Sequence, residues 1–238
     1  MTPAAKRFAA TLAFLALGAA LPAAAADLRE ARQASGFKSI VLEAPIELVL
    51  SQGTAEGLVL EGDAETLADI ETVVEDGVLR IRSKPRFLAA WRGKVRAIAT
   101  AKAVEALAVS GSGDIRAGAL NGERLKVAIA GSGDVRLDSF AGSRLEVAIS
   151  GSGDFAVAGR VDSIGARISG SGDIRAGKLE ARQASVAIAG SGDVVLWAKE
   201  SLAVSVAGSG DVRYYGDPTI DKSILGSGGL KRLGAAPS

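Results

Sequence analysis

The chain contains neither cysteine nor histidine. Without cysteine it can form no disulfide and can carry no lipid on an amino-terminal cysteine, so core packing must hold the fold together. Without either residue type it lacks the Ser-His-Asp and Cys-His pairs of common hydrolases and the ligands of nearly every zinc site. These two absences exclude most hydrolase chemistry.

Aromatic residues are scarce, and neither sign of charge is in excess. Aromatic residues make up 4% of the 238 residues, and the 28 Lys and Arg are balanced by 27 Asp and Glu. Proteins that bind nucleic acids or anionic membranes usually carry a basic excess, so we expect neither partner. The apolar residues are mostly Ala, Val, Leu and Ile, whose small side chains suit a narrow, layered interior.

Residues 1–26 have the three parts of a secretory signal peptide. Lys6 and Arg7 form a basic start, an apolar run follows from Phe8 to Leu21, and small residues precede a predicted cleavage site before Asp27. A retained membrane anchor is the alternative, but the run is short for a bilayer span, which takes about 20 residues. We therefore expect export to the periplasm, the cell surface or the medium, with no membrane span after cleavage.

A Gly-Ser-Gly-Asp tetrapeptide occurs six times, with about 18 to 20 residues from one copy to the next. A seventh Gly-Ser-Gly, starting at Gly226, is followed by Gly229 instead of aspartate. Repeats of this period are typical of stacked repeat architectures. The glycines and aspartates of the six copies are Gly111, Gly113, Asp114, Gly131, Gly133, Asp134, Gly151, Gly153, Asp154, Gly170, Gly172, Asp173, Gly190, Gly192, Asp193, Gly208, Gly210 and Asp211.

The residues on both sides of the tetrapeptide alternate with period two. Leu125, Val127 and Ile129 precede one copy, and Val135 and Leu137 follow it. This period predicts strands, and the same apolar positions recur in every copy. We therefore expect an all-β, single-domain β-solenoid whose coils bury one another's apolar faces. A leucine-rich repeat lacks support because its Leu and Asn frame is missing, and glycines with β-branched residues argue against helical repeats.

The stretch before the first tetrapeptide, residues 37–110, also contains short strand-like runs. A helix of one or two turns is expected at residues 63–69, with Asp63 as its N-cap. We interpret 37–110 as irregular N-terminal coils, because a solenoid needs atypical end units to protect its core and strand edges. The domain would span 37–233, with repeat coils at 111–229 and a tail at 234–238. The expected early strands are 37–42, 46–50, 58–61, 78–82 and 95–99.

Four segments carry a resemblance to a known family. They are the opening "FKSIVLEAPIELVLSQG", the segments "VEDGVLRIRS" and "VEALAVSGSGDI", and the ending "YYGDPTIDKSILGSGGLKRL". From about Phe37 to Leu233 the chain resembles the family called "putative auto-transporter adhesin, head GIN domain". The resemblance implies a right-handed β-helix in an exported bacterial protein. The family name implies a role in adhesion, and the resemblance implies no catalytic residues.

The tetrapeptide itself has several possible roles. Calcium is held by Gly-Asp repeats in β-rolls, but those repeat every nine residues. Here each coil supplies one aspartate, too few for the six to eight oxygen ligands of Ca²⁺. A dinucleotide site needs a third glycine that this motif never has. An enzyme of the β-helix class, such as a polysaccharide lyase or hydrolase, would need unique residues at one place, whereas these carboxylates are identical from coil to coil.

A structural corner is the role we predict. Glycine turns the chain at positive φ without strain, and the following aspartate can accept hydrogen bonds from backbone N–H groups. Arginine stands two residues after the aspartate in four copies and would offset the repulsion within a column of carboxylates. Ala156 and Val195 stand at that position in the two remaining copies. The four arginines are Arg116, Arg136, Arg175 and Arg213.

Binding is expected where the copies differ from one another. Exposed tryptophan and tyrosine can stack on sugar rings or anchor a protein interface. The candidates are Trp91, Arg92, Trp197, Tyr214 and Tyr215, with residues 83–94 expected as an exposed loop. The alternative is that each of these side chains covers a coil end or fills an irregular corner. The sequence thus predicts a non-catalytic binding or structural surface module without cofactor or metal. Its expected partner is an envelope polysaccharide or another protein. A carbohydrate-active β-helix enzyme of the cell envelope is the alternative.

Overall fold

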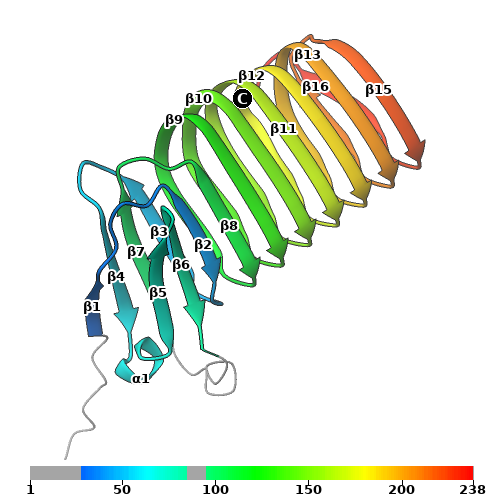
Figure 1. Cartoon of the computed structure of the whole chain (residues 1–238). Helices are drawn as coiled ribbons and strands as arrows, with labels where there is room; N and C mark the ends of the chain where they lie inside the picture. Colours follow the sequence, from blue (N-terminus) through cyan, green and yellow to red (C-terminus); the bar gives the residue numbers. More distant parts are fainter. Residues whose placement is uncertain (1–27, 85–94, 238) are drawn as a thin grey trace, which may run out of the picture.

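A computed structural model describes residues 28–84 and 95–237 as an elongated column of stacked β-strands (Figure 1). The predicted signal peptide lies outside these residues. In the described part of the chain, no helix is long and apolar enough to cross a bilayer. The elements are β1 (Leu28–Arg32), β2 (Ser39–Glu43), β3 (Glu47–Gln52), β4 (Gly57–Gly62), α1 (Ala64–Leu67), β5 (Ile70–Glu75), β6 (Val78–Ser83), β7 (Arg96–Ala101), β8 (Ala106–Gly111), β9 (Asp114–Gly131), β10 (Val135–Gly151), β11 (Phe155–Gly170), β12 (Ile174–Gly190), β13 (Val194–Gly208), β14 (Val212–Tyr215), β15 (Thr219–Gly226) and β16 (Leu230–Gly234).

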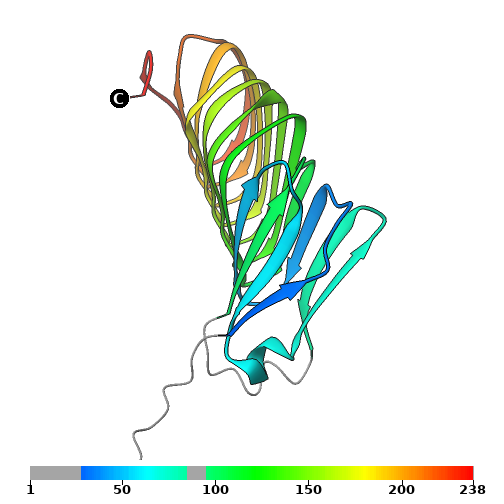
Figure 2. The same cartoon turned by 90° about the vertical axis from the view of Figure 1, so that its left-hand side faces the viewer.

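The regular part of the column consists of the long bent strands β9 to β13. Each pairs in parallel with the next, and a Gly-Ser-Gly corner connects one to the following strand. The bend divides each strand between two walls, as the view in Figure 2 shows. Wall A is formed by the first halves of β9 to β13 with β3, β7, β4, β1, β14 and β16. Wall B is formed by their second halves with β8, β2, β6, β5 and β15.

The core between the walls consists of columns of stacked apolar side chains. Leu125 pairs with Leu145, Val127 with Val147, and the columns continue through the following coils. These side chains are buried, and so are the apolar residues that follow each tetrapeptide, such as Phe155. The predicted all-β solenoid is confirmed, with about six turns. Because the pairing is in register, each coil covers the apolar face of its neighbour.

The N-terminal end departs from the regular coil. β2 and β3 pair in parallel with β8 and β9, but β4 pairs antiparallel with β7, and β5 antiparallel with β6. The expected helix is confirmed as α1, whose N-cap Asp63 accepts a hydrogen bond from the Thr66 N–H. Leu67 of α1 is buried against the core. The strands β1 and β5 were not expected from the sequence.

The C-terminal coil carries cations at positions that face the core in earlier coils. β15 aligns Lys222 with the buried Val204, and β16 aligns Arg232 with the buried Tyr214. Arg232 Nε donates a hydrogen bond to the carbonyl of Gly216 at 2.7 Å. Core-facing cations on edge strands oppose the addition of another strand. Large apolar side chains are exposed at this end of the column, namely Ile220, Leu225 and Leu233.

Candidate functional site

The first glycine of each tetrapeptide has a backbone conformation that few other residues adopt. Its φ is positive in all seven Gly-Ser-Gly copies, for example 106° at Gly111 and 131° at Gly151. The serine that follows donates its N–H to the first glycine of the preceding coil, as Ser152 does to Gly131 at 2.9 Å. The turn and the stacking are thus made by the same residues.

The second glycine of each tetrapeptide is required for a different reason. It has no positive φ, but a Cβ atom at Gly153 would lie 2.1 Å from the carbonyl oxygen of Gly133 and 2.9 Å from Cγ2 of Ile129. Similar contacts would arise at the second glycine of each of the other tetrapeptides. The corners of neighbouring coils therefore approach too closely for any side chain at this position.

The aspartates connect the corners into a continuous ladder of hydrogen bonds. Oδ1 of Asp134 accepts the N–H of Asp154 at 2.8 Å, and Oδ1 of Asp154 accepts that of Asp173 at 2.9 Å. The same bond links every pair of neighbouring coils from Asp114 onwards, and it ends where Asp211 accepts the N–H of Gly229. A carboxylate that accepts a backbone N–H satisfies a donor at the corner.

The arginines pair with these aspartates across coils more than within them. Arg175 donates to Oδ2 of Asp154 in the preceding coil at 2.8 Å and to Oδ2 of Asp173 at 3.1 Å. Arg213 donates to Asp193 of the preceding coil at 2.9 Å. The hydrogen bond to Asp154 raises the pKa of the Arg175 guanidinium above its usual value. The ion pairs thus join coils to one another.

Two of the four arginines do not pair with the ladder, which corrects the expected pattern. Arg116 instead forms an ion pair with Glu47, with Nε and Oε1 3.1 Å apart. Arg136 makes no hydrogen bond or ion pair with another described residue. The reason is spatial, since parallel strands place each guanidinium between the acidic groups of several coils, and the aspartate two residues earlier is only one of them.

An elongated hollow of about 570 Å³ lies on the outer face of wall A. Its floor includes Ala156 and Val195, which stand where other coils carry arginine, and Ala158, whose side chain is also small. Arg136 and Arg175 flank Ala156 in the register of the strands. The hollow therefore exists because the arginine column is interrupted. Asp138, Gly177, Lys178, Tyr215 and Pro237 also line it.

Tyr215 of β14 forms part of this hollow by reaching back across β13. A Cβ atom at Gly177 of β12 would lie 3.5 Å from Cε2 of Tyr215 and 3.0 Å from Cγ1 of Val195. The absence of a side chain at Gly177 thus leaves room for the ring. Pro237 also lines the hollow, so the end of the described chain returns from β16 to this face of wall A.

The other predicted binding residues have different positions. Trp197 is half-buried and pairs with Tyr215 in the register of wall A. The prediction that Tyr214 is a binding residue is wrong, because its side chain faces the core and is only 7% exposed. Successive side chains of a strand point to opposite faces, so Tyr215 is the one that faces outward. Trp91 and Arg92 lie outside the described residues. The sequence did not point to Gly177, Lys178 or Pro237, although the missing arginines at positions 156 and 195 were a usable signal.

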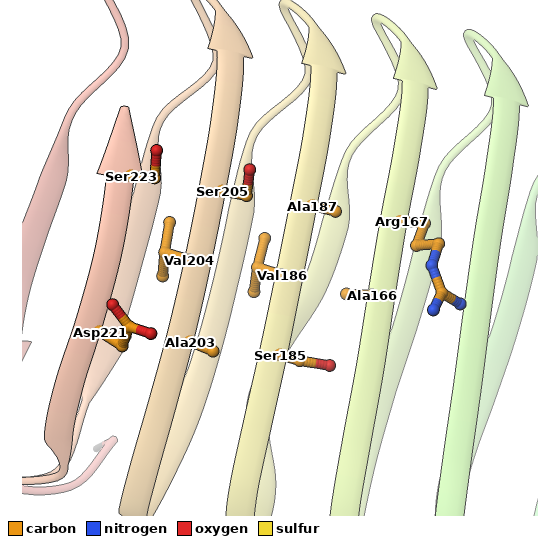
Figure 3. Close-up of a pocket in the computed structure, with 10 residues that line it drawn as sticks. All are labelled: Ala166, Arg167, Ser185, Val186, Ala187, Ala203, Val204, Ser205, Asp221 and Ser223. Atoms are coloured by element: carbon orange, nitrogen blue, oxygen red, sulfur yellow. The ribbon is translucent and has the colours of Figure 1, made fainter. Parts of the chain in front are cut away.

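Wall B carries a smaller hollow of about 300 Å³ (Figure 3). Ala and Ser side chains line most of it, including Ser185, Ala187 and Ser205, while Arg167 and Asp221 lie toward its two ends. A neighbouring hollow of about 290 Å³ on the same wall is lined in part by Arg144, Glu146 and Gln183. Among residues 28–84 and 95–237, no group of three or more acidic side chains is placed to hold a metal ion.

Comparison with known proteins identifies the family of the chain. Residues 36–218 match the family described as "Putative auto-transporter adhesin, head GIN domain". The chain belongs to this family. A solved structure described as a putative adhesin from Bacteroides fragilis is 25% identical, with a TM-score of 0.82 over 87% of this chain and 97% of that one.

Other solved structures share the fold of this GIN domain protein. One, described as a putative lipid binding protein from Parabacteroides distasonis, is 25% identical with a TM-score of 0.72, over 87% of this chain and 97% of that one. A putative adhesin from the same species is 20% identical with a TM-score of 0.68 over the same shares, which shows the fold alone. No curated protein matches the chain.

Proposed function

We propose that this GIN domain protein is an exported, non-catalytic binding module whose contact surface is the hollow on wall A. Its partner would be an envelope polysaccharide or another protein, met in the periplasm, at the cell surface or in the medium. Membership of an adhesin family and the likeness to a putative adhesin favour a binding role. The corner residues would serve as scaffold.

The observation that carries the proposal is the position of the hollow. The corners, the aspartate ladder and the core columns repeat from coil to coil, whereas the outer face of wall A breaks its pattern at Ala156 and Val195. A hollow of about 570 Å³ with an apolar floor, an aromatic side chain and a few charged groups has the composition of a ligand site. The repeated residues stabilise the fold, and the interruption of the arginine column at Ala156 and Val195 produces a surface that the other coils lack.

A binding panel tests the proposal. The purified protein is immobilised and exposed to extracted envelope polysaccharide, to solubilised envelope proteins and to phosphatidylglycerol vesicles. We expect retention of polysaccharide or protein, and no release of new reducing ends from the polysaccharide. Retention of none of the three materials would refute the binding role, and release of reducing ends would favour the carbohydrate-active enzyme instead.

Cell fractionation tests the export of the chain. The full chain, expressed in a bacterial host, is expected outside the cytoplasm with a mature amino terminus at Asp27, as sequencing of the purified product would show. A product in the cytoplasm that keeps residues 1–26 would contradict the export.

A further inference from the structure

We propose that the hollow on wall A binds a linear glycan that carries carboxylate groups. The inference rests on the proposed binding function and names the ligand class for the same surface. Three properties of the hollow carry it: its length, the state of its backbone groups and the chemistry of its lining.

The hollow is long and open rather than compact. Its lining residues come from β10, β11, β12, β13 and β14, with Arg136 at one end and Tyr215 at the other. Because the Tyr215 ring reaches back over Gly177 of β12, the hollow spans β10 to β13. Strands in a sheet lie about 4.8 Å apart, so it extends about 14 Å along the column. A volume of about 570 Å³ spread over this length fits an extended chain of a few linked units better than a compact small molecule.

The hollow has no open strand edge for an extended peptide. The strands that carry it have parallel neighbours on both sides, and the pairing shifts register near Asp138, Ala158 and Gly177. Peptides that bind to sheets do so mainly through main-chain hydrogen bonds at an open strand edge. A ligand on this face meets mainly side chains, which suits a glycan.

The lining combines unpaired cations with apolar surface. Arg136 and Lys178 make no ion pair with another described residue, and Arg175 is already held by the aspartate ladder. Among the described residues that line the hollow, Asp138 is the one acidic residue. Guanidinium and ammonium groups that lack a partner favour a ligand with carboxylates.

The apolar part of the lining suits the rings of a sugar chain. Ala156, Ala158 and Val195 form a flat floor, and Tyr215 lies over Gly177 at one end. A tyrosine ring gives rigid apolar surface with a polar tip, and the C–H faces of a sugar ring can pack against it. The floor is too open to enclose an acyl chain, since ligand pockets for apolar molecules bury most of their surface.

Restoring the repeat provides a sharp test. Ala156→Arg places an arginine where Arg136 and Arg175 stand in the neighbouring coils, so the column accepts it, and the new side chain fills the hollow while adding positive charge. Ala158→Leu fills the hollow without charge. Ala148→Arg is the matched control, because it adds the same charge on wall B, where the next coil carries Arg167 at that position.

Binding of hexagalacturonate and of neutral cellohexaose is measured by titration calorimetry, with circular dichroism as a check on folding. We expect wild type and Ala148→Arg to bind hexagalacturonate alike and cellohexaose weakly, and both filling variants to lose about tenfold or more in affinity. Arg136→Gln and Tyr215→Ala should each weaken hexagalacturonate binding, and added NaCl should weaken it further.

Some outcomes would overturn the inference. Tighter binding by Ala156→Arg would mean that net charge, not the hollow, attracts the ligand. Equal binding of cellohexaose, or of poly-glutamate as an acidic peptide, would contradict recognition of an acidic glycan. If the binding panel retains envelope material but the filling variants behave as wild type, this inference fails while the proposed function stands.

Discussion

Replacing single glycines by alanine separates the two structural requirements of the corner, which are a positive φ at the first glycine and a close approach between coils at the second. Gly153→Ala puts a Cβ 2.1 Å from the carbonyl oxygen of Gly133, although such contacts are essentially never shorter than 3.0 Å. The coils must therefore move apart by about 0.9 Å at the corner. Overpacking costs about 1–3 kcal/mol, and the loss of one or two corner hydrogen bonds adds about 1 kcal/mol each, so we expect about 2–5 kcal/mol of destabilisation.

Two further glycines supply the comparison. Gly111 has a φ of 106° but nothing within 4 Å of its added Cβ, so Gly111→Ala isolates the backbone conformation, at a cost of about 1–2 kcal/mol. Gly118 also has open space and no positive φ, and Gly118→Ala is expected to stabilise the protein by up to about 1 kcal/mol.

Urea unfolding followed by circular dichroism measures these effects. With a urea dependence of about 2–3 kcal/mol per molar, Gly153→Ala should lower the midpoint by about 1–2 M. Equal midpoints for Gly153→Ala and Gly118→Ala would refute the argument from close approach. An unchanged midpoint for Gly111→Ala would refute the argument from positive φ.

Three other predictions concern the ladder, the last coil and the helix cap. Asp173→Asn keeps a side-chain oxygen that accepts the Asp193 N–H and loses only the exposed ion pair with Arg175, so it should lower the free energy of unfolding by less than about 1 kcal/mol. Asp173→Ala also removes that acceptor and should cost about 1–2 kcal/mol, as measured by urea unfolding. Lys222→Val combined with Arg232→Leu should produce end-to-end oligomers in light scattering, because the core columns then continue to the open edge, and a monomer would contradict this. The Thr66 hydroxyl and N–H lower the pKa of Asp63, so the stabilisation by Asp63 is present above about pH 4 and is lost as the pH falls through the folded pKa. Asp63→Ala should remove this part of the dependence of stability on acid pH, and the same dependence in the variant and the wild type would contradict it.

Much of the fold follows from local and periodic features that a sequence displays. The apolar columns around Leu125 and Val135 predicted inward faces, because in-register stacking transfers each position to the next coil. The helix α1 was predictable from Asp63, since an N-cap is a local interaction. The strand β1 was not, because residues 28–32 lie at an edge and have little apolar pattern.

The candidate site was predictable only in part. Ala156 and Val195 could be recognised as exceptions, and Tyr215 as a candidate, from the sequence alone. The hollow itself depends on Tyr215 reaching across β13 and on Pro237 returning from β16 to this face of wall A, and both are contacts between distant parts of the chain. The pairing of Arg213 with the preceding coil likewise depends on strand packing rather than on spacing.

The aspartate ladder makes the number of coils adjustable. Each coil presents a free carboxylate oxygen on one side and a backbone N–H on the other, so any two neighbouring coils meet through the same contact. A unit running from Asp114 to Gly133 could be duplicated or removed without changing the contact at either junction. Gly229 has no carboxylate, so the series stops there whatever its length. The column can therefore grow or shorten in evolution by whole coils, while the ends and the hollow keep their own residues.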